Sequence, residues 1–207
     1  MNLDAIETII RLLGGVLAYT TLGILLYGIW RGTRRQAGLT TGRMGTWLHS
    51  PLFYFITSVI YFGACYLGWK PLPLAVTPLA RLWMLALGSV LYFPGMSFAL
   101  WGRLALGRHY FVSTGFGAQL FTDQPLITGG PYAIVRHPMY SGIMLAALGS
   151  LLIYATWTTL LFVLFSPLLT FRARREEIAL AAGFGEQWRE YCRRVPAFLP
   201  RFRRNRL

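Results

Sequence analysis

Long apolar segments leave this chain few folds other than a bundle of membrane-spanning helices. The first three have the roughly 17–25 residues that a helix needs to cross hydrocarbon. The last two are shorter, and we expect them to form a tight helical hairpin that turns near residues 154–156. Because apolar residues surround each segment instead of following one face, an amphipathic soluble bundle does not fit. The sequence predicts an all-α, polytopic integral membrane protein of about five transmembrane helices, at residues 6–30, 52–69, 82–101, 138–154 and 156–171.

The composition agrees with this class. Hydrophobic residues make up 55% of the chain and charged residues only 13%, against about 25% charged residues in soluble domains. A length of 207 residues fits one integrated domain. Within it, we expect residues 1–101 to supply three transmembrane helices and residues 102–207 to form a cytoplasmic loop, the helical hairpin and the C-terminal helices. Asp4 and Glu7 stand where a signal peptide would be basic, so we expect the first segment to be retained.

The distribution of basic residues predicts the orientation. With the N-terminus outside, 17 of the 20 Lys and Arg residues fall in the inside segments 31–51, 102–137 and 172–207. This puts the C-terminus in the cytoplasm, where we expect a helix to about residue 182 and a second one over 186–194 to form a C-terminal helical cap. If the source is bacterial, the membrane is the inner membrane.

The net charge of +13 has the same origin. It reflects the excess of basic residues in the segments expected inside, together with a basic tail over residues 201–206. This tail suits anionic lipid headgroups. We therefore expect membrane lipids and no nucleic acid as partners, and no obligate protein partner is evident. The two cysteines and three histidines lack metal-ligand spacing, so no metal site is predicted.

A polar string at the start of the fourth apolar segment is the first candidate site. Pro138 fits the first turn of a helix, which places Arg136 and His137 directly before it, with nearby backbone N–H groups directed at an anion. Tyr140 follows just inside the helix. Together these groups are typical of a carboxylate receptor. The alternative is an interfacial belt, because Arg and Tyr often lie at headgroup level without further function.

A second polar cluster, residues 172–177, follows the last apolar segment. The two apolar segments between the clusters would cross the membrane once in each direction, so both clusters should lie on the same side of the membrane. Arg172 and Glu176 are one helical turn apart and could simply form a local ion pair. Alternatively, Glu176 and Glu177 bind a cation, and carboxylates beside a carboxylate receptor suit a zwitterion. An amino acid that carries a sulfonium is one such ligand, and nearby aromatic rings would favour its cation.

Several further motifs stand in a fixed order with these two clusters. The order is 105–108 (ALGR), 126–132 (LITGGPY), 136–142 (RHPMYSG), the arginines and glutamates of 172–177, and 194–196 (RVP). This ordered combination, over roughly residues 100–200, resembles the isoprenylcysteine carboxyl methyltransferases and their bacterial relatives. A string of the type Arg-His-Pro-x-Tyr also occurs in related membrane methyltransferases and sterol reductases, so the combination and not that string carries the resemblance.

The resemblance implies S-adenosylmethionine as methyl donor, with S-adenosylhomocysteine as product, in a cytoplasmic pocket covered by the C-terminal region. Residues 102–207 would then be the catalytic, cofactor-binding region. The implied catalytic residues are Arg172 and Arg174, which would position the acceptor carboxylate, and Glu176, which would also contact the donor. Gln124 stands where the family usually has a histidine, and Trp188 where a tyrosine is common. The implied donor-binding residues are Gln124, Leu126, Gly130, Tyr132, Arg136, His137, Tyr140, Glu176 and Glu177.

The implied acceptor is lipophilic, and we expect the carboxylate of an isoprenylcysteine-like or isoprenoid molecule that enters sideways from the bilayer. A carboxylate is already ionised at neutral pH and needs no general base. An amine or thiol acceptor would need one, so a phospholipid or thiol methyltransferase on the same donor site stays possible. An NADPH-dependent membrane lipid reductase is also compatible with the sequence, as is a membrane anchor or lipid-binding module without enzymatic activity.

Overall fold

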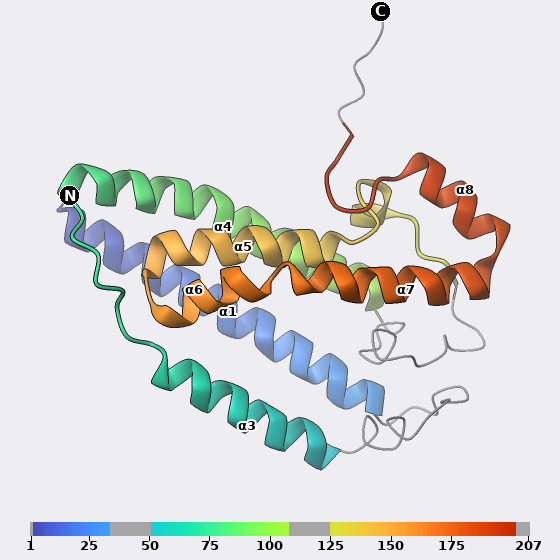
Figure 1. Cartoon of the computed structure of the whole chain (residues 1–207), viewed down its shortest axis with the longest axis horizontal. Helices are drawn as coiled ribbons and strands as arrows, with labels where there is room; N and C mark the ends of the chain where they lie inside the picture. Colours follow the sequence, from blue (N-terminus) through green and yellow to red (C-terminus); the bar gives the residue numbers. More distant parts are fainter. Residues whose placement is uncertain (1, 34–50, 108–124, 202–207) are drawn as a thin grey trace, which may run out of the picture.

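The computed structural model describes residues 2–33, 51–107 and 125–201, and the regular elements of this part are helices, which confirms the all-α prediction (Figure 1). Pro71 and Thr156 also form an isolated antiparallel β-bridge. The elements are α1 (Leu3–Thr33), α3 (Pro51–Leu67), α4 (Pro78–Leu106), the short 3-10 helix η3 (Gly130–Ala133), α5 (Pro138–Tyr154), α6 (Trp157–Phe165), α7 (Leu168–Phe184) and α8 (Glu186–Arg194).

Two helices of the described ranges are long and apolar enough to cross a membrane. They are Leu3–Gly28 in α1 and Pro78–Leu106 in α4. Only 11% and 28% of their apolar windows are buried, whereas the core helix of a soluble protein would be mostly covered. Helices with this much exposed apolar surface indicate an integral membrane protein. The total of five spans stays a prediction, as does the division of the chain at residue 101, through which α4 continues.

The last predicted span differs from the structure at Pro167. We expected one helix from residue 156 to beyond 171, but α6 ends at Phe165 and α7 begins at Leu168. Proline lacks the N–H that a continuous helix would use and clashes with the preceding turn. The turn is closed instead by short-range bonds, from the Leu169 amide to the Ser166 carbonyl at 3.0 Å and from the Thr170 amide to the Pro167 carbonyl at 3.0 Å.

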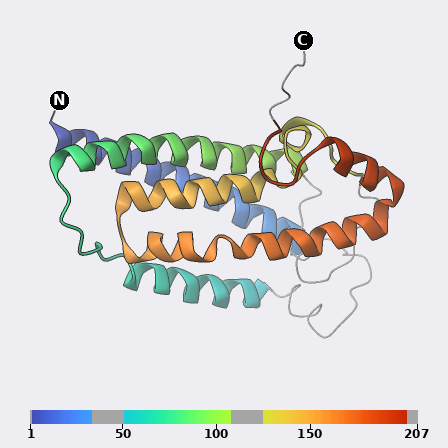
Figure 2. The ribbon, with the colours of Figure 1, turned by 45° about the horizontal axis from the view of Figure 1, so that its top comes forward.

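Helices α4 and α5 lie side by side in both views (Figures 1 and 2). Glycines allow the close approach: a Cβ atom on Gly142 would lie 2.5 Å from the backbone of Gly95 and Ala99. Helix α1 joins them through Tyr92, which donates a hydrogen bond to the Gly14 carbonyl at 2.8 Å. Since α4 and α5 are antiparallel, α5 begins beside Gly102 near the end of α4. This places the polar string of residues 130–140 at that end.

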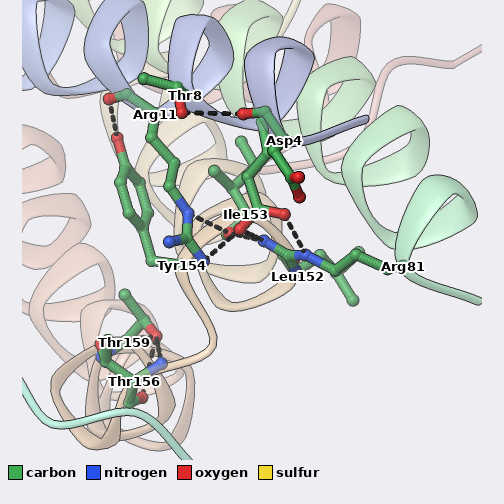
Figure 3. Close-up of polar contacts among 10 residues, drawn as sticks. Asp4, Thr8, Arg11, Arg81, Leu152, Ile153, Tyr154, Thr156 and Thr159 are labelled. Atoms are coloured by element: carbon green, nitrogen blue, oxygen red, sulfur yellow. Dashed lines mark hydrogen bonds and ion pairs between the residues drawn. The ribbon is translucent and has the colours of Figure 1, made fainter. Parts of the chain in front are cut away.

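At the opposite end of the bundle, arginines bind the last carbonyl groups of α5 (Figure 3). Arg81 donates to Leu152 at 2.9 Å and to Ile153 at 2.6 Å, and its guanidinium also binds both oxygens of Glu7 at 2.9 and 2.7 Å. Arg11 donates to Ile153 at 3.3 Å. The last carbonyls of a helix have no partner within it, so these arginines fix α5 against α1 and α4.

Helix α8 folds back from the end of α7 (Figure 2). Gly185 makes this reversal with φ of +52°, a conformation in which glycine carries no penalty. The predicted second helix over 186–194 is confirmed to the residue. Its apolar side forms a buried cluster of Trp188, Tyr191 and Val195 that packs on Leu126 and on α7.

Candidate functional site

The segment before α5 is built by a sharp turn and a prolyl helix start. Gly130 opens η3 with φ of +61°, and the Tyr132 hydroxyl reaches the Gly102 carbonyl of α4 at 3.4 Å. His137 precedes the first turn of α5, and Pro138 occupies that turn as the sequence predicted. The chain is thereby held at the junction of α4 and α5, with Arg136 and His137 facing the C-terminal helices.

Arg136 joins the segment before α5 to α7 and to the last residues of α8 and Val195 after it. Its Nε and Nη2 atoms donate to Glu177 Oε1 at 3.0 and 2.8 Å, and Nη1 donates to the Val195 carbonyl at 2.8 Å and to the Cys192 carbonyl at 3.4 Å. The guanidinium carbon also lies 5.9 Å from the centre of the Trp188 ring, within the range of a cation–π contact. All of these contacts are to the protein itself.

His137 shares Glu177 with Arg136. Its Nε2 atom lies 3.0 Å from Glu177 Oε1, and only 5% of its side chain is exposed. The hydrogen bond to His137 lowers the pKa of Glu177 to about 2, with a further contribution from Arg136, against the opposing effect of burial. A carboxylate held this firmly in its ionised form by two neighbours is typical of a structural ion pair.

Glu176 points to a different set of partners. The Tyr140 hydroxyl donates to Glu176 Oε1, and Arg172 Nε lies 3.4 Å from the same oxygen, so the expected local ion pair is present. The side chains of Glu176 and Arg172 are 19% and 29% exposed. The neighbouring glutamates therefore have different partners, since Glu177 binds Arg136 and His137 whereas Glu176 binds Tyr140 and Arg172.

The polar backbone next to Arg136 is also satisfied internally. The amide of Arg136 donates to the Pro196 carbonyl at 2.8 Å, and that of His137 to the Ala197 carbonyl at 3.0 Å. We expected amides in this segment to face a ligand anion. These two do not, because they donate hydrogen bonds to the carbonyls of Pro196 and Ala197. The expected carboxylate receptor is thus closed at Arg136 and at these two amides.

The remaining predicted residues lie at varying distances from this cluster. Leu126 packs against the buried cluster of α8, and Gly130 faces the Trp101 ring, 3.8 Å from the position of a Cβ atom. Arg174 is exposed on α7, and within the described ranges it has no hydrogen bond or ion pair with Glu176 or Glu177. Gln124 lies outside the described residues.

Sequence reasoning missed Ser141 and Phe198. The Ser141 hydroxyl donates to the Phe198 carbonyl at 2.8 Å. The Phe198 ring stacks on His137 with ring centres 5.3 Å apart and 26° between the planes. The sequence offers one indication, because Phe198 is an aromatic residue soon after Pro196, where the helix was expected to end. It does not identify the residue against which the Phe198 ring packs.

Three similar proteins are 37–38% identical to this chain over stretches of 78–81 residues. The protein-S-isoprenylcysteine O-methyltransferase of Schizosaccharomyces pombe is 38% identical over 80 residues, which is 38% of this chain and 34% of that protein. The cobalt-zinc-cadmium resistance protein CzcN of Cupriavidus metallidurans is 37% identical over 81 residues, 38% of this chain and 37% of that protein. The Delta(14)-sterol reductase of Mus musculus is 37% identical over 78 residues, 36% of this chain and 19% of that protein.

The match thus spans little more than a third of the first two relatives and a fifth of the reductase. The sequence model of the phospholipid methyltransferase family extends further, over residues 83–187, from α4 into α8. This range contains η3, α5, α6 and α7, and with them the contacts that join the segment 136–140 to the glutamates of α7. Since it covers just over half of the 207 residues, the chain belongs to the phospholipid methyltransferase family.

Proposed function

We propose that this protein is an S-adenosylmethionine-dependent methyltransferase that acts on a lipophilic acceptor at the cytoplasmic face of a membrane. One observation carries the proposal. In a chain of the phospholipid methyltransferase family, the segment Arg136–Tyr140 and the pair Glu176–Glu177, some forty residues apart, meet through direct hydrogen bonds. Two polar clusters that the fold brings together in an otherwise apolar chain are a candidate site.

The residues around Glu176 fit such a donor. S-adenosylmethionine carries a sulfonium, an ammonium and ribose hydroxyls, and the partly exposed Glu176 carboxylate beside Tyr140 accepts hydrogen bonds and favours a cation. When bound, the donor supplies an activated methyl group. Glu176 and Tyr140 would touch it, together with Gln124, Leu126, Gly130 and Tyr132. Arg136, His137 and Glu177, which bind one another, would hold this wall in place.

Arg172 is the better candidate of the two arginines for the acceptor. It lies 3.4 Å from Glu176, whereas Arg174 is exposed elsewhere on α7. An acceptor carboxylate is ionised at neutral pH and requires only to be positioned and shielded from water. An isoprenylcysteine-like or isoprenoid carboxylate fits both this arginine and the exposed apolar faces of the helices. An amine headgroup or a thiol is the alternative acceptor on the same donor site.

The arrangement of the helix ends supports a five-span topology with the site in the cytoplasm. Helices α1 and α4 begin at the end where α5 finishes, as the contacts of Arg81 with Glu7 and Ile153 require. Helix α4 ends where α5 begins, and the helices therefore alternate in direction as five passes demand. The C-terminal cap of α7 and α8 then lies on the side that holds most arginines, the expected inside.

A reductase is the second candidate because of the similarity to the Delta(14)-sterol reductase of Mus musculus. Transfer of a radiolabelled methyl group separates the possibilities. The purified protein should transfer label from S-adenosylmethionine to an S-prenylated N-acetylcysteine and form a base-labile methyl ester. Base-stable label on a phospholipid or thiol would mean that the proposed donor is right and the proposed carboxylate acceptor is wrong. Oxidation of NADPH with a sterol or other lipid, without methyl transfer, would overturn the proposal.

A further inference from the structure

A short segment after α8 lies against the candidate site. Residues 195–198, here called the C-terminal strap, give four carbonyl groups to the segment before and at the start of α5. Val195 accepts from the Arg136 side chain at 2.8 Å, and Pro196 and Ala197 accept from the amides of Arg136 and His137 at 2.8 and 3.0 Å. Finally, Phe198 accepts from the Ser141 hydroxyl at 2.8 Å.

The strap also carries an aromatic ring to His137. The Phe198 ring lies 5.3 Å from the His137 ring at an interplanar angle of 26°, and the Tyr140 ring lies 5.8 Å from it at 15°. Nearly parallel rings at these separations are in the range of offset stacking. His137 is thus held by two rings and by Glu177, while Tyr140 in turn binds Glu176.

We propose that Phe198 is a positioning residue that fixes the His137 ring and, through Glu177 and Tyr140, the orientation of the Glu176 carboxylate in the donor site. The proposal rests on the function proposed above. Without the Phe198 ring, His137 can rotate about its side-chain bonds and leave Glu177. The single helical turn that carries Glu176 and Glu177 then loses a contact on one side.

The surroundings of Phe198 separate this role from general packing. The buried cluster of the cap is formed by Trp188, Tyr191 and Val195, whereas Phe198 is only partly buried and the next residue, Leu199, is 80% exposed. The strap is held mainly through its backbone carbonyls, which a substitution of the Phe198 side chain leaves in place. Such a variant should therefore keep the fold and change the orientation of His137.

The test compares Phe198→Leu and Phe198→Tyr with Leu199→Ala as a matched control, all in the full chain in mild detergent. Calorimetry measures the Kd of S-adenosylhomocysteine, and the ring signals of labelled histidine are followed by NMR, with His137 assigned by the variant His137→Gln. We expect Phe198→Leu to raise the Kd roughly tenfold, the loss of one stacked pair. Phe198→Tyr should stay within about twofold of wild type, and Leu199→Ala should bind like wild type.

The His137 signal distinguishes the possible failures. The signal to follow is that of the His137 Nε2 nitrogen, which responds to the hydrogen bond with Glu177. It should shift in Phe198→Leu, as that hydrogen bond is weakened, and stay in place in Leu199→Ala. An unchanged Kd in Phe198→Leu overturns the inference, as does an unchanged Nε2 signal. A loss of binding that Phe198→Tyr fails to restore, with a lowered thermal midpoint, reveals a packing role and also overturns it. If wild type binds no S-adenosylhomocysteine, the proposed function fails, and the Nε2 signal then decides whether Phe198 positions the His137 ring.

Discussion

At the scale of single residues, two adjacent glutamates have different partners. Glu177 is bound by Arg136 and His137. Glu176 binds the Tyr140 hydroxyl and a partly exposed arginine, Arg172, and we propose its carboxylate as the group that a cationic donor contacts. The sequence identified both glutamates but not their separate partners, because these come from segments far apart along the chain.

The low pKa of Glu177 predicts a pH-dependent loss of stability. Its pKa is lowered from an ordinary 4.5 to about 2, so its contribution is fully present above pH 4.5 and is lost as the pH falls toward 2. The difference in thermal midpoint between wild type and Glu177→Gln should therefore shrink as the pH falls below that ordinary value. Glu190→Gln, which removes a carboxylate from an exposed ion pair of α8, is the matched control and should change the thermal midpoint little. A difference that stays constant down to about pH 3 would contradict the assignment.

The contacts of Arg136 predict that the protein loses stability even when lysine replaces this arginine. Its guanidinium binds Glu177, Val195 and Cys192 at once, and the ammonium of lysine cannot reproduce that fork. Arg136→Lys should lower the free energy of unfolding by roughly 2 kcal/mol, the value of a hydrogen bond to a charged group. Arg189→Lys, at a largely exposed pair with Glu186, is the control. Equal stability of the two variants, measured by chemical unfolding in detergent, would show that the contacts of Arg136 contribute little.

At the scale of elements, α4 and α5 carry the site on a glycine-lined contact. The apolar run and its first proline located α5 to the residue, since Pro138 starts the helix and the run ends at Tyr154. It could not find the break at Pro167, because a proline inside an apolar run is compatible with either a kinked or an ended helix. Nor could it foresee that the C-terminal strap closes on Arg136, a contact between segments 59 residues apart.

The close approach of α4 and α5 predicts a large effect of one methyl group. An alanine at Gly142 would place its Cβ 2.5 Å from the backbone of Gly95 and Ala99, and backbone cannot yield as a flexible side chain can. Gly142→Ala should lower the thermal midpoint, although alanine itself favours a helix by about 1 kcal/mol over glycine. Gly23→Ala in α1, which meets no atom within 4 Å, is the control and should be neutral or stabilising. Equal midpoints would contradict the described packing.

At the scale of the whole molecule, the distribution of basic residues predicts the orientation, with the C-terminal helices in the cytoplasm. Labelling of single cysteines tests it in a background without Cys65 and Cys192. A cysteine replacing Leu74, in the exposed segment between α3 and α4, should react with an impermeant maleimide on intact cells. One replacing Leu199, which is 80% exposed at the other end, should react only after permeabilisation. Reaction of both from the same side would contradict the five-pass topology.

The claim that the two polar clusters form one donor site is tested most directly by calorimetric titration of S-adenosylhomocysteine. Wild type should bind saturably, and Glu176→Gln should weaken binding at least about tenfold because the carboxylate that faces the donor loses its charge. Glu190→Gln removes the same charge from an exposed position and should bind like wild type. Absence of binding to folded wild-type protein, or equal binding by both variants, would contradict a donor site at Glu176.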